Sequence, residues 1–154
     1  MENMRLLVTG GSGFIGTNLM AFYIAKGIPL VNLDWNPPLD PAHRPWWKEC
    51  DIMDTERMRV LFAEFAPTHV VHLAARADTD EPNDILAYQQ NHTGTERVLA
   101  VVKEIPSIER LIVTSTQFVC EAGYQPEHDL DFKPFTLYGE TKRRTEMATR
   151  EAGL

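Results

Sequence analysis

The stretch LLVTGGSGFIG, Leu6–Gly16, is an apolar run that ends in a cluster of glycines. An apolar run of this length, followed by glycines and then by apolar residues at helical spacing, predicts a strand, a tight turn and a helix. Gly11, Gly13 and Gly16 fit the pattern G-x-G-x-x-G. With Gly10 in place of Gly11, the looser pattern G-x-x-G-x-x-G fits as well. Such a turn lets a pyrophosphate approach bare backbone at a helix N-terminus, although the pattern alone also fits a glycine-rich turn without a ligand.

The composition is that of one globular domain of 154 residues, with 44% hydrophobic and 24% charged residues. The formal net charge is −7 and no basic stripe is visible, which argues against nucleic acid or an anionic membrane as a partner. No apolar run approaches the roughly 18 residues of a membrane span. Cys50 and Cys120 form neither a metal-ligand spacing nor a disulfide framework. We therefore expect no metal and a reduced, cytoplasmic setting.

Strand and helix signals alternate along the whole chain. Strands are predicted at residues 5–9, 30–33, 49–51, 69–74 and 110–115, and helices at 13–26, 54–65, 84–103 and from 138 almost to the end. This alternation predicts an α/β fold with a doubly wound parallel sheet of the Rossmann type, in the strand order 3-2-1-4-5. A ligand is then expected at the carboxyl ends of the first and fourth strands, where the winding reverses.

Asp34 ends the second predicted strand, 18 positions after Gly16. A carboxylate at this place can accept hydrogen bonds from both hydroxyls of an adenosine ribose and repels a 2′-phosphate, which favours NAD over NADP. Asp51 and Ile52 end the third predicted strand and are expected to border the adenine. Each carboxylate has an alternative role, in which it only caps a turn or a helix.

Tyr138 and Lys142 are four residues apart on a predicted helix and so share one face. A lysine ammonium beside a phenol is expected to lower the pKa of the tyrosine, which makes it a usable acid or base near neutral pH. Thr114, Ser115 and Thr116 close the fifth predicted strand, where a hydroxyl can point into the cleft. Each pattern alone also fits a solvated helix pair or an ordinary strand end.

The order of these pieces resembles the extended short-chain dehydrogenase/reductase family, and within it the NAD-dependent nucleotide-sugar epimerases and dehydratases. The resembling pieces are TGGSGFIG at Thr9–Gly16, Asp34, DI at Asp51–Ile52, HLAA at His72–Ala75, N-x-x-G-T at Asn91–Thr95, TST at Thr114–Thr116 and YGETK at Tyr138–Lys142.

The resemblance implies a role for each matched residue. Tyr138 is implied as the catalytic acid and base, Lys142 as its partner and Thr116 as the catalytic hydroxyl. Tyr138 would take a hydroxyl proton while hydride moves from the same carbon to the nicotinamide. The implied cofactor-binding residues are Gly10, Gly13, Phe14, Ile15, Gly16, Asp34, Asp51, Ile52, Leu73, Ala74, Ala75, Asn91, Tyr138 and Lys142.

The chain also departs from the family pattern. Gln117 and Phe118 stand where sugar 4,6-dehydratases carry an Asp-Glu pair, which disfavours that dehydration. Family members continue well beyond the Y-x-x-x-K helix, so we expect this NAD-binding domain, residues 1–154, to lack the C-terminal strands and the domain that binds a nucleotide sugar. The resemblance further implies a homodimer through helices 84–104 and 138–152.

Two other functions stay open. The chain could be a dinucleotide-binding module that is inactive on its own and serves as a sensor or scaffold, or an extended-family reductase of a non-sugar carbonyl.

Overall fold

The computed structural model describes residues 3–80 and 83–153, and within them one parallel sheet in the order β3-β2-β1-β4-β5. The doubly wound prediction is therefore confirmed. The strands are β1 Leu6–Thr9, β2 Leu30–Asp34, β3 Trp47–Glu49, β4 His69–His72 and β5 Arg110–Val113. The helices are α1 Phe14–Ala25, α2 Thr55–Phe65, α3 Thr95–Glu104 and α4 Leu137–Glu151, with short helical turns η1 Pro41–Trp46, η2 Ile85–Tyr88, η3 Gln90–Gly94 and η4 Gln117–Val119.

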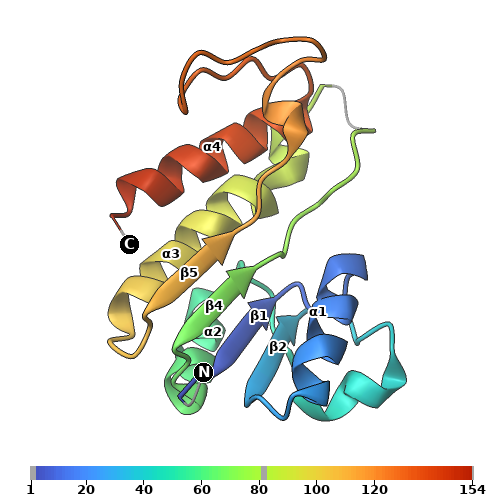
Figure 1. Cartoon of the computed structure of the whole chain (residues 1–154), viewed down its shortest axis with the longest axis vertical. Coiled ribbons are helices and arrows are strands. Elements are labelled where there is room, and N and C mark those ends of the chain that lie inside the picture. Colours follow the sequence, from blue (N-terminus) through green and yellow to red (C-terminus); the bar gives the residue numbers. More distant parts are fainter. Residues whose placement is uncertain (1–2, 81–82, 154) are drawn as a thin grey trace.

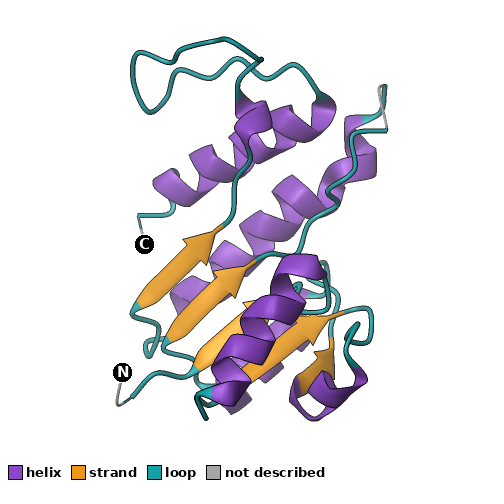
Figure 2. Cartoon of the chain, turned by 45° about the vertical axis from the view of Figure 1, so that its right-hand side comes forward, coloured by secondary structure: helices purple, strands orange, loops and turns teal. Residues whose placement is uncertain are grey.

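Helices cover both faces of the sheet (Figures 1 and 2). The side chains of β1 alternate between the faces, as the pleat of a strand requires. Leu6 and Val8 pack with Met20 of α1, whereas Leu7 belongs to a second core formed with residues of α2 and α3, such as Phe62. Because β1 is buried on both sides, its sequence reads as a continuous apolar run.

Helix boundaries follow ordinary capping chemistry. The Asp54 carboxylate accepts a hydrogen bond of 2.9 Å from the backbone N–H of Arg57 and so begins α2. The hydroxyl of Thr136 accepts one of 2.9 Å from Gly139 N–H at the start of α4. After α1, Gly27 adopts a φ of +66°, which suits a residue without a side chain.

Several predicted boundaries were wrong. The helix predicted over 84–103 is helical without interruption from 85 to 104 but changes type along its length: η2 is a 3-10 turn, η3 is a π turn of five residues, and only α3 is a regular α-helix. The third strand lies at Trp47–Glu49 rather than 49–51, since Trp47 pairs with Asn32 and its indole N–H donates to the Asp34 carbonyl at 2.9 Å. The fourth and fifth strands end earlier than predicted, at His72 and Val113.

The glycine turn after β1 lies directly against the end of β4. Gly10 has a φ of +76°, and a Cβ built on it would lie 2.7 Å from the Cα of Ala74. Gly16 meets the turn from the other side, because a Cβ there would lie 2.6 Å from the carbonyl carbon of Gly11. These two approaches bring β1, α1 and β4 together at one end of the sheet.

We predict that Gly10→Ala lowers the free energy of unfolding by more than about 2 kcal/mol, because it adds both backbone strain and overlap with β4. Gly27→Ala is the matched control: its φ of +66° is similar, but a Cβ there meets nothing within 4 Å. Strain alone should cost the control about 1 kcal/mol. Urea unfolding of both variants measures the difference, and equal losses would show that the approach to β4 contributes nothing.

Candidate active site

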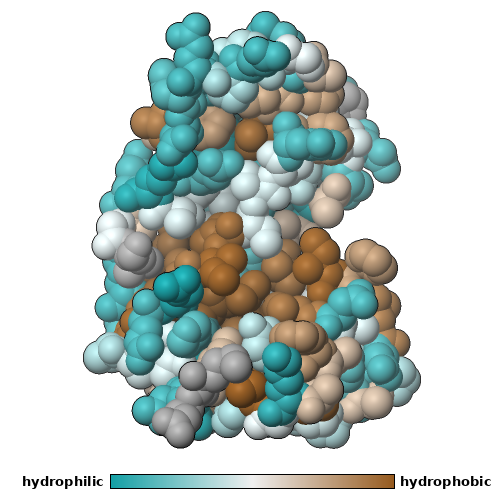
Figure 3. All heavy atoms as spheres, in the orientation of Figure 1, coloured by the Kyte–Doolittle hydropathy of each residue, from teal (hydrophilic) through white to brown (hydrophobic). Residues whose placement is uncertain are grey.

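A cleft of about 830 Å³ lies at the carboxyl ends of the strands. Figure 3 shows the molecule hollowed on the side toward which the strands point. The lining comes from the glycine turn, the ends of β2 and β4, the loops that follow β2 and β3, and the segment around η2. Eight predicted cofactor-binding residues line it: Gly10, Gly13, Asp34, Asp51, Ile52, Leu73, Ala74 and Ala75. The cleft therefore lies where the reversal of winding places ligands.

The Asp34 carboxylate faces this cleft and is fixed by two backbone N–H groups. Its Oδ2 accepts from Ser12 N–H at 3.1 Å and its Oδ1 from Asn36 N–H at 2.9 Å. Each carboxylate oxygen has a second acceptor site. Asp34 can thus cap the turn and still accept two ribose hydroxyls, so the two roles considered for it are compatible.

Asp51 lies at the other border of the cleft and caps a turn. Its Oδ1 accepts from Met53 N–H at 2.8 Å. This contact fits the turn role, and the position in the cleft also fits the predicted role beside an adenine.

Gly13 is the N-cap of α1, and no side chain caps that helix end. The first-turn N–H groups of a helix have no intrahelical partner, so those of Phe14 and Ile15 can serve an anion. The side chains of these two residues are 81% and 62% exposed and do not line the cleft. Gly16 is buried against the turn, where it has a packing role.

Tyr138 and Lys142 lie on successive turns of α4, outside the cleft lining. Lys142 is only 3% exposed, and burial lowers its pKa to about 8, against a smaller opposite effect of Glu146. Its charge also reaches His72: burial and then Lys142 lower the pKa of that imidazole to about 3. His72 is therefore neutral, and the ammonium of Lys142 lies near the end of β4.

The expected depression of the Tyr138 pKa was wrong. Burial raises the pKa of Tyr138 above its ordinary value, and a hydrogen bond with Thr116 offsets part of this rise. Lys142 is not among the causes. Sharing a helix face sets the spacing of the two side chains, but it does not by itself bring the ammonium close enough to outweigh the lost hydration of the phenol.

Thr116 reaches Tyr138 because η4 and the start of α4 touch. A Cβ on Gly139 would lie 2.9 Å from the carbonyl carbon of Phe118, so only glycine permits this approach. The ring of Phe118 also packs on Tyr138, with 6.2 Å between centroids. Sequence reasoning missed Gly139, although its place inside YGETK was a usable signal.

Asn91 lies beside α4 and away from the cleft lining, with only 1% of its surface exposed. Its amide pairs with both backbone groups of Arg76, accepting at 2.8 Å and donating at 2.9 Å, and also donates to the Thr141 hydroxyl at 3.1 Å. The carbonyl freed by the π turn accepts from Thr95 and Thr145 hydroxyls at 2.6 and 2.7 Å. Asn91 therefore ties the end of β4 to α4.

His72 completes this buried network, a role that the sequence reasoning did not assign. Its Nδ1 pairs with the Thr9 hydroxyl at 2.6 Å and its Nε2 with Thr95 at 2.9 Å. Its position at the start of HLAA was the available signal.

A parallel sheet in this order, with a glycine turn and an aspartate facing one cleft, defines a Rossmann-type domain. Residues 6–153 match the NAD dependent epimerase/dehydratase family, and the chain belongs to that family.

Three similar proteins illustrate the range of the family. A UDP-glucuronate 4-epimerase of Thermodesulfobacterium geofontis is 28% identical, over 92% of this chain and 49% of the relative. The 4-hydroxy-2-methyl-3-oxo-4-farnesyl-3,4-dihydroquinoline-1-oxide ketoreductase of Stigmatella aurantiaca is 29% identical, over 97% and 46%. The crystal structure of Thermus thermophilus UDP-glucose 4-epimerase in complex with NAD is 27% identical, with a TM-score of 0.83, over 97% and 51%. The chain thus spans about half the length of these relatives.

None of the helices within residues 3–80 and 83–153 combines the length and the apolar character that a bilayer crossing needs. The same residues contain no group of three or more His, Cys, Asp or Glu side chains that could hold a metal ion.

We predict that Lys142→Met raises the free energy of unfolding by about 1–2 kcal/mol at pH 7, because a buried ammonium has lost its hydration. The unfolded lysine titrates near 10.4, so between pH 8 and that value the unfolded chain binds more protons than the native chain. The native protein should therefore gain stability over this range, and the advantage of the variant should shrink. Urea unfolding from pH 7 to 10 measures this, with exposed Lys48→Met as control. A loss of stability in Lys142→Met would contradict the prediction.

Proposed function

We propose that this chain is the NAD-binding and catalytic portion of a nucleotide-sugar epimerase-like oxidoreductase, in which Tyr138 assists hydride transfer between a sugar hydroxyl carbon and NAD. The observation that carries the proposal is the cleft that Gly10, Gly13 and Asp34 line together with Ala74 and Ala75. Tyr138 is connected to this cleft through its ring contact with Tyr88, the neighbour of the lining residue Ala87. Membership of the family and the NAD complex of the Thermus enzyme support it.

The described residues fit a dinucleotide. The cleft volume of about 830 Å³ is in the range of cofactor pockets. The uncapped start of α1 would hold the pyrophosphate, Asp34 the adenosine ribose, and Ala74 and Ala75 would lie under the nicotinamide half. NAD, when bound, would supply the hydride acceptor or donor at its nicotinamide ring.

Proton handling would fall to Tyr138. Its raised pKa keeps the phenol protonated at neutral pH, so it starts as an acid that can donate to a carbonyl oxygen while hydride reaches the carbonyl carbon. In the reverse direction the phenolate would take the proton of a sugar hydroxyl. The Thr116 hydroxyl already offsets part of the rise in the Tyr138 pKa, and Lys142, with a pKa of about 8, carries a positive charge that would favour the phenolate if the two side chains approach.

Two alternatives have specific support. The Stigmatella ketoreductase is similar over nearly the whole chain, which keeps reduction of a non-sugar carbonyl as a second candidate. The chain covers about half the length of its relatives, which keeps open a second alternative: a binding module that is inactive on its own. A homodimer through residues 84–104 and 138–152 stays a prediction.

Calorimetry with NAD and NADP tests the cofactor assignment. We expect NAD to bind at least about ten times more tightly, because Asp34 would repel the 2′-phosphate. Asp34→Asn should remove most of this preference. Asp40→Asn, in the loop after β2 but outside the cleft lining, is the matched control and should keep it. Equal affinity of the native chain for both cofactors would contradict the role of Asp34.

Tyr138→Phe should leave NAD affinity within about twofold and reduce turnover by at least about a hundredfold, because the ring stays and the proton is lost. The measurement is the absorbance of reduced cofactor with UDP-glucose, UDP-glucuronate and simple ketones. Unchanged turnover would remove Tyr138 from the mechanism. A native chain that binds NAD but turns over none of these compounds would favour the binding module.

A further inference from the structure

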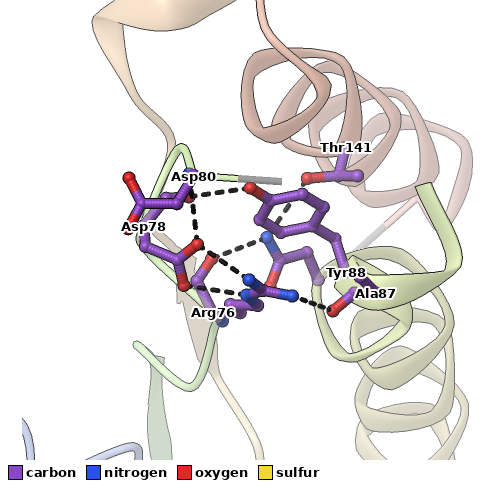
Figure 4. Close-up of polar contacts among 7 residues, drawn as sticks. Arg76, Asp78, Asp80, Ala87, Tyr88 and Thr141 are labelled. Carbon is purple, nitrogen blue, oxygen red and sulfur yellow. Dashed lines mark hydrogen bonds and ion pairs between the residues drawn. The ribbon is translucent and has the colours of Figure 1, made fainter. Parts of the chain in front are cut away.

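Arg76 follows HLAA directly and lines the cleft. Its Nε and Nη2 donate to the two carboxylate oxygens of Asp78 at 2.8 and 3.0 Å, and its Nη1 donates to the Ala87 carbonyl at 3.1 Å (Figure 4). A fork of this kind fixes the plane of a guanidinium as well as its position. The plane of the Arg76 guanidinium is therefore set by the Asp78 carboxylate and by the Ala87 carbonyl of η2.

The Arg76 guanidinium lies over a buried aromatic ring. The guanidinium carbon of Arg76 is 4.7 Å from the centroid of Tyr88, a residue with no exposed surface. The Tyr88 hydroxyl donates to the Asp78 carbonyl at 3.1 Å, as Figure 4 shows. Tyr88 is thus held at its face by Arg76 and at its hydroxyl by the same loop.

Tyr88 in turn contacts Tyr138, with ring centroids 6.4 Å apart and planes tilted by 46°. A second path reaches Tyr138 through the backbone. Asn91 holds both backbone groups of Arg76 and donates to Thr141, whose hydroxyl donates to the Tyr138 carbonyl at 2.8 Å. The ring and the backbone of Tyr138 are therefore both braced against the segment that begins at Arg76.

We propose that Arg76 is a positioning residue that holds the Tyr88 ring against Tyr138 and so fixes the orientation of the phenol relative to the cleft. This role rests on the proposed function, in which Tyr138 moves the proton. Lysine cannot replace Arg76, because a single ammonium cannot bind both Asp78 oxygens and the Ala87 carbonyl in one plane. The Tyr88 ring carries the contact with Tyr138, and its hydroxyl only ties the ring to the loop.

Fluorine NMR of the chain labelled with fluorotyrosine tests this role without NAD or substrate. Tyr138→Phe identifies the Tyr138 resonance. Arg76→Gln, Arg76→Lys and Tyr88→Leu should each shift this resonance and move the Tyr138 titration midpoint toward that of a hydrated phenol by about half a unit or more, because water reaches the ring. Tyr88→Phe, which keeps the ring, should retain the native resonance and midpoint.

Arg59→Gln is the matched control, because Arg59 also forms a two-pronged pair with a carboxylate, that of Glu104, far from Tyr138. It should leave the Tyr138 signal unchanged. A native Tyr138 signal in both Arg76→Gln and Tyr88→Leu would overturn the positioning role, whatever the thermal stability of the variants. Failure of the proposed function would instead appear as absent NAD binding or turnover with the fluorine shifts still present, so the two failures are distinguishable.

Discussion

The close backbone approach of Gly10 to Ala74 is the constraint on which the rest of the site depends. Because no side chain separates them, the turn after β1 meets the end of β4, and the backbone of Gly10 lines the cleft. Gly16 adds the same kind of contact between α1 and the turn, which aims the uncapped start of that helix at the cleft. Three elements are thus brought to one place by the lack of side chains, and a ligand can approach N–H groups that a Cβ would shield.

A buried polar network holds α4 in place, just as the close approach of glycines holds α1 against the turn after β1. The π turn at Gln90–Gly94 frees the Asn91 carbonyl for two threonine hydroxyls, while the Asn91 side chain pairs with the backbone after β4. Breaking a hydrogen bond between buried groups costs free energy, because one partner is then left buried and unpaired. The network therefore fixes the register of α4 against the sheet, and with it the positions of Tyr138 and Lys142. π turns are frequent at functional sites.

The sequence predicted those features that depend on local pattern. The glycine turn, the strand alternation and Asp34 at the end of β2 all follow from residue type and spacing, and the structure places Asp34 at the predicted edge. The π turn within the helix predicted over 84–103 has no local signature, because it differs from a regular helix by a single residue. The raised pKa of Tyr138 could not be derived from its spacing to Lys142, since burial by Tyr88 and Phe118 depends on tertiary packing.

Burial shifts the pKa values of Tyr138 and Lys142 in opposite directions, and perturbed pKa values of this kind cluster at functional sites. Loss of hydration raises the pKa of the phenol and lowers that of the ammonium, so each group is driven toward its neutral form. A fold selected for stability alone would place an apolar side chain at a position that is 3% exposed and, within the described residues, offers the ammonium no carboxylate within ion-pair distance. A lysine with a pKa of about 8 changes its charge within reach of neutral pH, and it lies one helical turn from a phenol whose pKa burial has raised. A buried ammonium that lowers stability fits the trade between stability and activity that is common at active sites.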